Sequence, residues 1–169
     1  ARFQPQFHRP TRRFVEFGDQ VAVAVADIEP TLEGFGKRQT SDMATHIAQL
    51  ARYRFPEKVV PKGLRKTFQE MGALDCEIAH KLTELLRTED VKLAEEIRDE
   101  DDKIDALHLS VFDKVLGETW KGGAEDTVDA TLASRYHERF ADHAVEVARR
   151  VIFQVTGHNP DEEQLPAAR

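Results

Sequence analysis

Hydrophobic residues recur at intervals of three and four positions from Pro61 to Gly157, which covers most of the second part of the chain. This spacing places them on one face of an α-helix. It predicts three long helices, separated by segments with helix-ending residues. Their approximate bounds are Pro61 or Lys62 to Arg87, Asp90 to Val115 or Leu116, and Ala124 or Glu125 to Val155.

Each predicted helix carries an apolar stripe that we expect to be buried. The first stripe consists of Leu64, Phe68, Met71, Leu74, Ile78, Leu82 and Leu85. The second consists of Leu93, Ile97, Ile104, Leu107, Val111 and Val115. The third helix has two apolar faces, which favours a central position packed on both sides. One face carries Val128, Leu132, Tyr136, Phe140, Val147 and Val151, and the other Ser134, Ala141, Val145, Ala148, Ile152 and Val155.

The pattern before Pro61 is less regular. Residues 14–28 fit either a helix or a short strand, and a helix is predicted from Asp42 to Arg54, before Pro56. The segment Asp42–Ala48 has the same skeleton as Asp142–Ala148, one hundred positions later. This echo favours a tandem repeat of three-helix units with an incomplete or divergent first copy. We therefore expect an all-α protein with a first repeat at 1–58, a second at 61–157 and a tail at 158–169.

The composition of the chain excludes several classes of function and of site. The 169 residues include 24 Lys and Arg against 31 Asp and Glu, a net charge of −7, and one Cys. An acidic chain argues against nucleic acid as the main partner, because phosphate neutralisation needs clustered cations. A single Cys excludes an internal disulfide framework and a cysteine-rich zinc site. No apolar run approaches the roughly 20 residues of a membrane span. Without an apolar leader at the start, a cytoplasmic location is expected.

Two pairs of acidic residues stand where chemistry could occur. Asp101 and Asp105 lie four apart on the second predicted helix, and Glu138 and Asp142 lie four apart on the third. A four-residue step puts both side chains of a pair on one helical face, where like charges repel. Asp101 takes the place of an apolar residue four positions after Ile97, which favours burial.

Four buried carboxylates need a counter-charge, and a cation with hard oxygen ligands would supply it. The sequence thus predicts a metal site formed by Asp101, Asp105, Glu138 and Asp142. A second interpretation remains open, in which these acids are solvated or paired with nearby cations. The candidate cations are Arg98, Lys103, Arg135 and Arg139.

Histidines allow a third interpretation, from the class of enzymes. Glu77 and His80, like Asp105 and His108, have the Glu-x-x-His type of spacing found in di-iron helical bundles. A ferritin-like di-iron carboxylate enzyme would use these four residues together with Glu138. The motif is short and His is common in this chain, so chance explains it better.

The segment from Arg135 to Ala148, RYHERFADHAVEVA, closely resembles the C-terminal signature of the PhoU family, and the likeness continues to Gly157. Upstream, residues 100–105 (EDDKID) resemble the acidic motif of the family's preceding helix. Residues 42–52 and the following FPEKVVP resemble the junction between the two repeats of that family.

This resemblance implies two three-helix bundles whose E/D-x-x-x-D motifs bind metal ions such as iron, manganese, zinc or magnesium. In the second repeat these motifs correspond to Asp101/Asp105 and Glu138/Asp142. In the first, only Asp42 stands at a motif position, and Arg38 replaces the usual Glu.

The resemblance also implies a cytoplasmic, non-enzymatic regulator of phosphate uptake and phosphate-starvation signalling. Its expected partners are the ATPase of the phosphate ABC transporter and a phosphate-responsive sensor histidine kinase. We also expect a homodimer, because an incomplete first bundle would expose apolar helix faces. The remaining alternatives are the di-iron enzyme and an acidic helical scaffold whose carboxylates are simply solvated.

Overall fold

The computed structural model describes residues 37–50 and 59–160. These ranges contain the α-helices α2 (Lys37–Leu50), α3 (Arg65–Thr88), α4 (Val91–Leu116) and α5 (Ala124–Thr156), and the 3₁₀ turn η1 (Lys62–Leu64). No strand occurs within them. The predicted all-α class is confirmed, as are the three long helices. The element predicted within 14–28, the last four residues of the helix predicted from Asp42 to Arg54, and most of the C-terminal tail lie outside the described residues.

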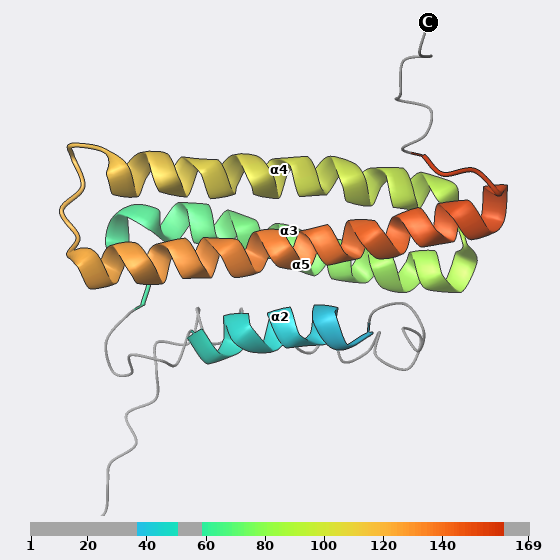
Figure 1. The fold of residues 1–169 in the computed structure, drawn as a ribbon, viewed down its shortest axis with the longest axis horizontal. Helices are drawn as coiled ribbons and strands as arrows, with labels where there is room; N and C mark the ends of the chain where they lie inside the picture. Colours follow the sequence, from blue (N-terminus) through green and yellow to red (C-terminus); the bar gives the residue numbers. More distant parts are fainter. Residues whose placement is uncertain (1–36, 51–58, 161–169) are drawn as a thin grey trace, which may run out of the picture.

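Helices α3, α4 and α5 form an antiparallel three-helix bundle, with α5 in contact with both other helices (Figure 1). Helix α2 packs along α5 on the side of the bundle away from α4 (Figure 1). Helix α5 therefore contacts three other helices. This agrees with the central position predicted from its two apolar faces.

The ends of the bundle helices follow local sequence signals. The side chain of Asp90 accepts a hydrogen bond of 2.9 Å from the backbone N–H of Lys92 and so caps α4. Glu89, just before it, has a left-handed φ of 56° and ends α3. Gly157 ends α5 with a φ of 74°, a conformation that glycine adopts without steric cost. The connection between α3 and α4 is thus only two residues long.

The apolar stripes of α3 and α4 form the core, as predicted. Met71, Ile78, Ile97 and Ile104 are fully buried. The prediction for α5 was wrong at one end of its first stripe, because Val128 and Leu132 are 56% and 43% exposed. The reason is the direction of these positions on the helix. At 3.6 residues per turn, Val128 and Leu132 lie about 180° and about 140° around α5 from the buried His137, so both face away from the core.

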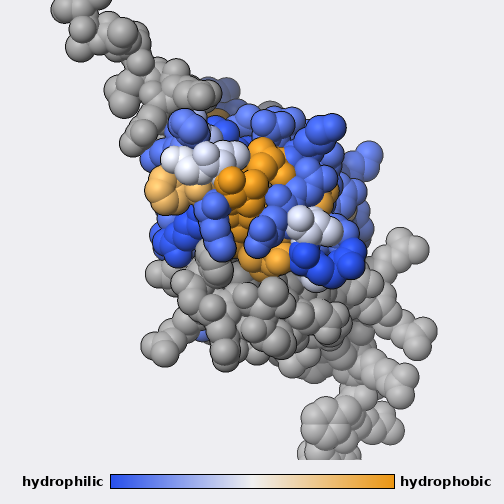
Figure 2. Space-filling model, turned by 90° about the vertical axis from the view of Figure 1, so that its right-hand side faces the viewer, coloured by the Kyte–Doolittle hydropathy of each residue, from blue (hydrophilic) through white to orange (hydrophobic). Residues whose placement is uncertain are grey.

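The bundle also leaves apolar side chains visible at one end. Figure 2 shows the end where α4 begins and α5 ends, with hydrophobic residues gathered in the middle of a hydrophilic ring. Phe153 and Val155, in the last turns of α5, are 57% and 46% exposed.

Candidate functional site

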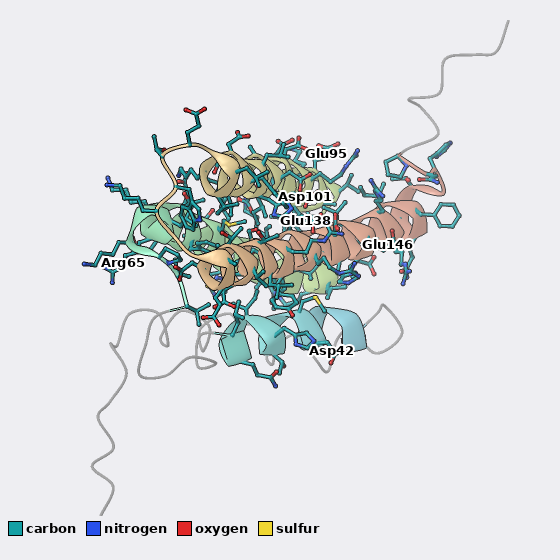
Figure 3. All side chains as sticks on the ribbon, turned by 60° about the vertical axis from the view of Figure 1, so that its left-hand side comes forward. Asp42, Arg65, Glu95, Asp101, Glu138 and Glu146 are labelled. Atoms are coloured by element: carbon teal, nitrogen blue, oxygen red, sulfur yellow. The ribbon has the colours of Figure 1, made fainter. Side chains whose placement is uncertain are left out.

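The seam between α4 and α5 brings the four predicted acids together. Asp101 and Asp105 project from successive turns of α4, and Glu138 and Asp142 from successive turns of α5. A hydrogen bond of 3.0 Å between His108 Nδ1 and Ser134 Oγ links the two helices close by. Asp101 and Glu138 are labelled side by side in Figure 3, one from each helix.

The four carboxylates differ in burial. Glu138 is 9% exposed and Asp101 is half-buried, whereas Asp105 and Asp142 are exposed. The prediction that all four lie in a dry seam was therefore wrong for two of them. A step of four residues turns about 400° around a helix, so Asp105 and Asp142 are rotated about 40° from Asp101 and Glu138. In both helices this rotation is away from the core, toward solvent.

The acids repel one another strongly. Burial raises the pKa of Asp101 to about 7, with further contributions from Asp105, Asp142, Asp102 and Glu138. Burial and the nearby Asp142 likewise raise the pKa of Glu138 and of Asp105. Asp101, Asp105 and Glu138 therefore each lie close enough to another acid for its charge to make their own ionisation less favourable.

Two oxygens of this acidic cluster, defined as Asp101, Asp105, Glu138 and Asp142, have no donor. Asp101 Oδ1 and Glu138 Oε2 are buried and have no hydrogen-bond partner. The other Glu138 oxygen, Oε1, accepts a hydrogen bond from the guanidinium of Arg135. Pairing with arginine, the second interpretation of the sequence, is thus correct for one oxygen of one acid. A buried carboxylate oxygen without a donor is costly, which indicates that a positively charged species belongs beside it.

The cluster fits a cation in its chemistry. It offers only carboxylate oxygens, the ligands that hard cations prefer. As the side chains lie, no group of three His, Cys, Asp or Glu residues in the described ranges could hold a metal ion. To bind a cation, the acids would have to turn toward a common point. A surface cavity of about 470 Å³ reaches one member of the cluster, Asp101, and is also lined by Asp102, Arg98 and Arg149 among others.

Comparisons with known proteins identify the family of the helical bundle. The family described as "PhoU domain" matches residues 68–151, which include all four acids of the cluster. The chain belongs to the PhoU family. No solved structure matches it.

Several curated PhoU proteins are similar to this chain. It is 42% identical over 127 residues to "Phosphate-specific transport system accessory protein PhoU homolog 1" of Mycobacterium leprae, an alignment covering 75% of this chain and 57% of the relative. It is 46% identical over 118 residues to "PhoU homolog 2" of Mycobacterium tuberculosis, covering 70% and 55%. The chain thus spans little more than half the length of these relatives.

The acid of α2 at a family motif position does not join the acidic cluster. Asp42, the one first-repeat acid at a PhoU motif position, is exposed on α2. Among the described helices, none is long and apolar enough to cross a membrane.

The di-iron ligand set is not brought together. Glu77 and His80 are exposed on α3, whereas the acidic cluster lies between α4 and α5. His108 is hydrogen-bonded to Ser134, and its ring packs edge-on against Phe112 at a centroid distance of 4.9 Å. Within residues 37–50 and 59–160, no set of three His, Cys, Asp or Glu side chains is placed so that it could hold a metal ion.

A second polar cluster, which the sequence analysis missed, lies in the core of the PhoU bundle between α3 and α5. His137 Nδ1 is 2.5 Å from Asp75 Oδ2, and both side chains are at least 97% buried. The ring of Phe68 packs 5.8 Å from that of His137. Burial raises the pKa of Asp75, and the neighbouring imidazole opposes this effect. The available signal was Asp75 itself, which interrupts the first apolar stripe four positions after Met71.

Proposed function

We propose that this chain is a PhoU-type accessory regulator of phosphate uptake and phosphate-starvation signalling. It acts in the cytoplasm through protein contacts, with the ATPase of the phosphate ABC transporter and a sensor histidine kinase as partners, and it has no enzymatic activity of its own. The match of its bundle to the PhoU domain supports this role, as do relatives named accessory proteins of a phosphate-specific transport system.

The role in regulation has a direct genetic test. Deleting the gene should raise expression of phosphate-uptake genes in phosphate-rich medium, because the accessory protein restrains the starvation response. Expression can be followed with a reporter fused to an uptake promoter, and the intact gene supplied on a plasmid should restore repression. Unchanged expression in the deletion strain would contradict this role.

We further propose that the acidic cluster binds metal, with Asp101, Asp105, Glu138 and Asp142 as ligands. The observation that carries this proposal is a pair of buried oxygens, Asp101 Oδ1 and Glu138 Oε2. Neither accepts a hydrogen bond, and both belong to a cluster of carboxylates. Iron, manganese, zinc and magnesium are the candidate ions. Manganese, magnesium and iron are favoured by the all-oxygen donor set.

A bound cation would supply the positive charge that the cluster lacks. It would favour the ionised form of each acid and join α4 to α5 through ligands from both helices. Metal would therefore stabilise the bundle and reduce the negative charge of this face. Both effects would change the surface that the protein presents to a partner.

Metal content and thermal stability test the site. Wild type and Asp101→Asn/Glu138→Gln are purified in parallel, stripped with chelator, and reloaded with manganese. We expect stoichiometric manganese and a rise in Tm for wild type, and at least about a hundredfold weaker binding for the variant because two ligands are lost. The matched control is Asp113→Asn/Glu146→Gln, which removes the same charge from exposed positions of the same helices.

The control should bind manganese as wild type does. Equal manganese content in wild type and in Asp101→Asn/Glu138→Gln would show that these acids are not manganese ligands. If the control lost as much manganese binding as the ligand variant, the loss would be due to the change in net charge and not to missing ligands.

A further inference from the structure

Exposed apolar and acidic residues share one side of α4. This surface, here called the outer face, is formed by Asp102, Asp105, Leu109, Asp113 and Leu116 of α4, with Val128 of α5. The five α4 residues follow one another at steps of three or four, so they lie on one helical face. All six are exposed.

Val128 joins this surface from the neighbouring helix. Because His108 and Ser134 are hydrogen-bonded across the antiparallel pair, positions on the two helices can be aligned from that point. Leu116 lies about 12 Å along α4 from His108, and Val128 about 9 Å along α5 in the same direction from Ser134. Val128 is also seven positions before Arg135, whose charge acts on Asp105 and His108 of α4. Leu116 and Val128 are therefore neighbours at one end of the outer face.

The apolar end of the outer face is unusually exposed. The exposed fractions are 64% for Leu109, 76% for Leu116 and 56% for Val128. A single exposed leucine is ordinary, whereas several on one face indicate a contact surface. Helix α2 packs on α5 from the opposite side of the bundle (Figure 1), so it does not cover this face.

The remainder of the outer face is acidic. Asp102, Asp105 and Asp113 are exposed there, and the exposed Asp142 of α5 lies close enough to raise the pKa of Asp105. Two cations near this face are engaged elsewhere, since Arg135 pairs with Glu138 and Lys114 donates to Thr67 of α3. A second copy of this chain would present another acidic face and repel the first. A basic surface is the complement.

We propose that the outer face binds an amphipathic, basic helix of a partner protein. Apolar residues of that helix pack on Leu109, Leu116 and Val128, and its Lys or Arg residues pair with Asp102, Asp105 and Asp113. From Asp102 to Leu116 the face is about 21 Å long, which matches about four turns of a docked helix. This inference goes beyond the proposed regulatory role because it names the contact surface and the chemistry of the partner.

A designed peptide tests the proposal on the full chain. The probe is a labelled synthetic helix of about 18 residues, with leucines along one face of its first half and lysines along the same face of its second half. Fluorescence anisotropy should show saturable binding that weakens as salt is raised, because charge pairs contribute to it. A scrambled peptide of identical composition and a version with Glu in place of Lys should bind at least about tenfold more weakly.

Two variants separate the apolar and acidic contributions. Leu109→Ser/Leu116→Ser should lower affinity for the probe by about tenfold or more. Asp102→Asn/Asp113→Asn should lower it several-fold and reduce its salt dependence. All four positions are exposed, so circular dichroism should show unchanged helix content, and neither variant removes a proposed metal ligand. The matched control is Phe153→Ser, an equally exposed apolar residue at the opposite end of the bundle.

Several results would overturn the proposal. They are no binding to wild type, equal binding of the scrambled peptide, wild-type affinity in Leu109→Ser/Leu116→Ser, or an equal loss in Phe153→Ser. Self-association of the wild type that disappears in Leu109→Ser/Leu116→Ser would assign the face to a second copy instead. Manganese content is measured on the same samples, so that this proposal and the metal proposal are tested separately. These variants should bind manganese normally whether or not they bind the probe.

Discussion

Two clusters of buried or half-buried charged groups in the bundle are built differently. In the core, the carboxylate of Asp75 meets the imidazole of His137 at 2.5 Å. In the α4–α5 seam, Asp101 and Glu138 meet other carboxylates, and one oxygen of each has no donor. Asp75 Oδ1 also lacks a hydrogen-bond partner, but the other oxygen of Asp75 meets an imidazole within the fold. The acids of the seam face mainly one another, and Arg135 pairs with Glu138. This difference separates a structural contact from a candidate binding site.

Removing one member of the core pair should have the largest effect on stability. Asp75→Ala leaves a buried imidazole without its partner, and we expect a loss of about 3 kcal/mol in the free energy of unfolding. Urea denaturation of metal-free protein measures this loss. Glu70→Ala, on the exposed face of the same helix, is the control and should change stability by less than about 0.5 kcal/mol. A loss below about 1 kcal/mol for Asp75→Ala would show that the pair does not hold α3 to α5.

Neutralising an acid of the seam should instead raise the stability of the metal-free protein. The pKa of Asp101 is raised to about 7 in the folded protein from 3.8, so the folded state holds the proton more tightly than the unfolded state. Its contribution to stability is present below about pH 4 and is lost as the pH rises to about 7. At pH 8 without metal, Asp101→Asn should therefore raise Tm by a few degrees, and at pH 5 by less.

Thermal melts of wild type and Asp101→Asn from pH 5 to pH 8, in chelator, check this prediction. The comparison between the two proteins isolates Asp101, because His108 and His143 act in the other direction. Burial lowers the pKa of both histidines, so their contributions are lost as the pH falls. A variant that is less stable than wild type at pH 8 would contradict the assignment of Asp101 to a repulsive cluster.

The smallest expected effect concerns Arg135, the cation paired with Glu138 in the seam. Arg135 lowers the pKa of Glu138 and of Asp105, and it occupies one oxygen of Glu138. Arg135→Gln should reduce metal-free stability by less than about 1 kcal/mol, because this pair is half-exposed. It should also strengthen manganese binding several-fold, measured by titration calorimetry.

Arg150→Gln is the matched control for that experiment, since Arg150 pairs with Glu146 on a separate exposed part of α5. Its manganese affinity should equal that of wild type. If Arg135→Gln weakened manganese binding instead, Arg135 would be an organising group for the acids rather than a competitor of the metal.

The fold could be predicted from sequence wherever periodicity and capping agree. Asp90 before a regular stripe marked the start of α4, and Gly157 after the last stripe marked the end of α5. The same reasoning failed at Val128 and Leu132, because periodicity shows that a stripe is apolar without showing how far around the helix the contacts with other helices extend. Both residues lie on the side of α5 away from the buried His137.

The two polar clusters were predictable to different degrees. Asp101 stood out because it interrupts an apolar stripe and has an acidic neighbour four positions later. Asp75 interrupts a stripe in the same way, but its partner lies 62 positions away on α5. Local spacing identifies charged groups that share a helix, whereas a pair across the bundle depends on how the helices are aligned. For the same reason, the family resemblance indicated the acids of the seam but not their unequal burial.

The short connection between α3 and α4 makes that end of the bundle a pivot. Only Glu89 and Asp90 separate these helices, whereas α4 and α5 are joined at the opposite end by the longer segment 117–123. Asp101 lies about 15 Å along α4 from Val91, and Leu116 about 38 Å. A cation drawing Asp101 toward α5 would therefore tilt α4 as a lever, and the displacement at Leu116 would be about two and a half times that at Asp101.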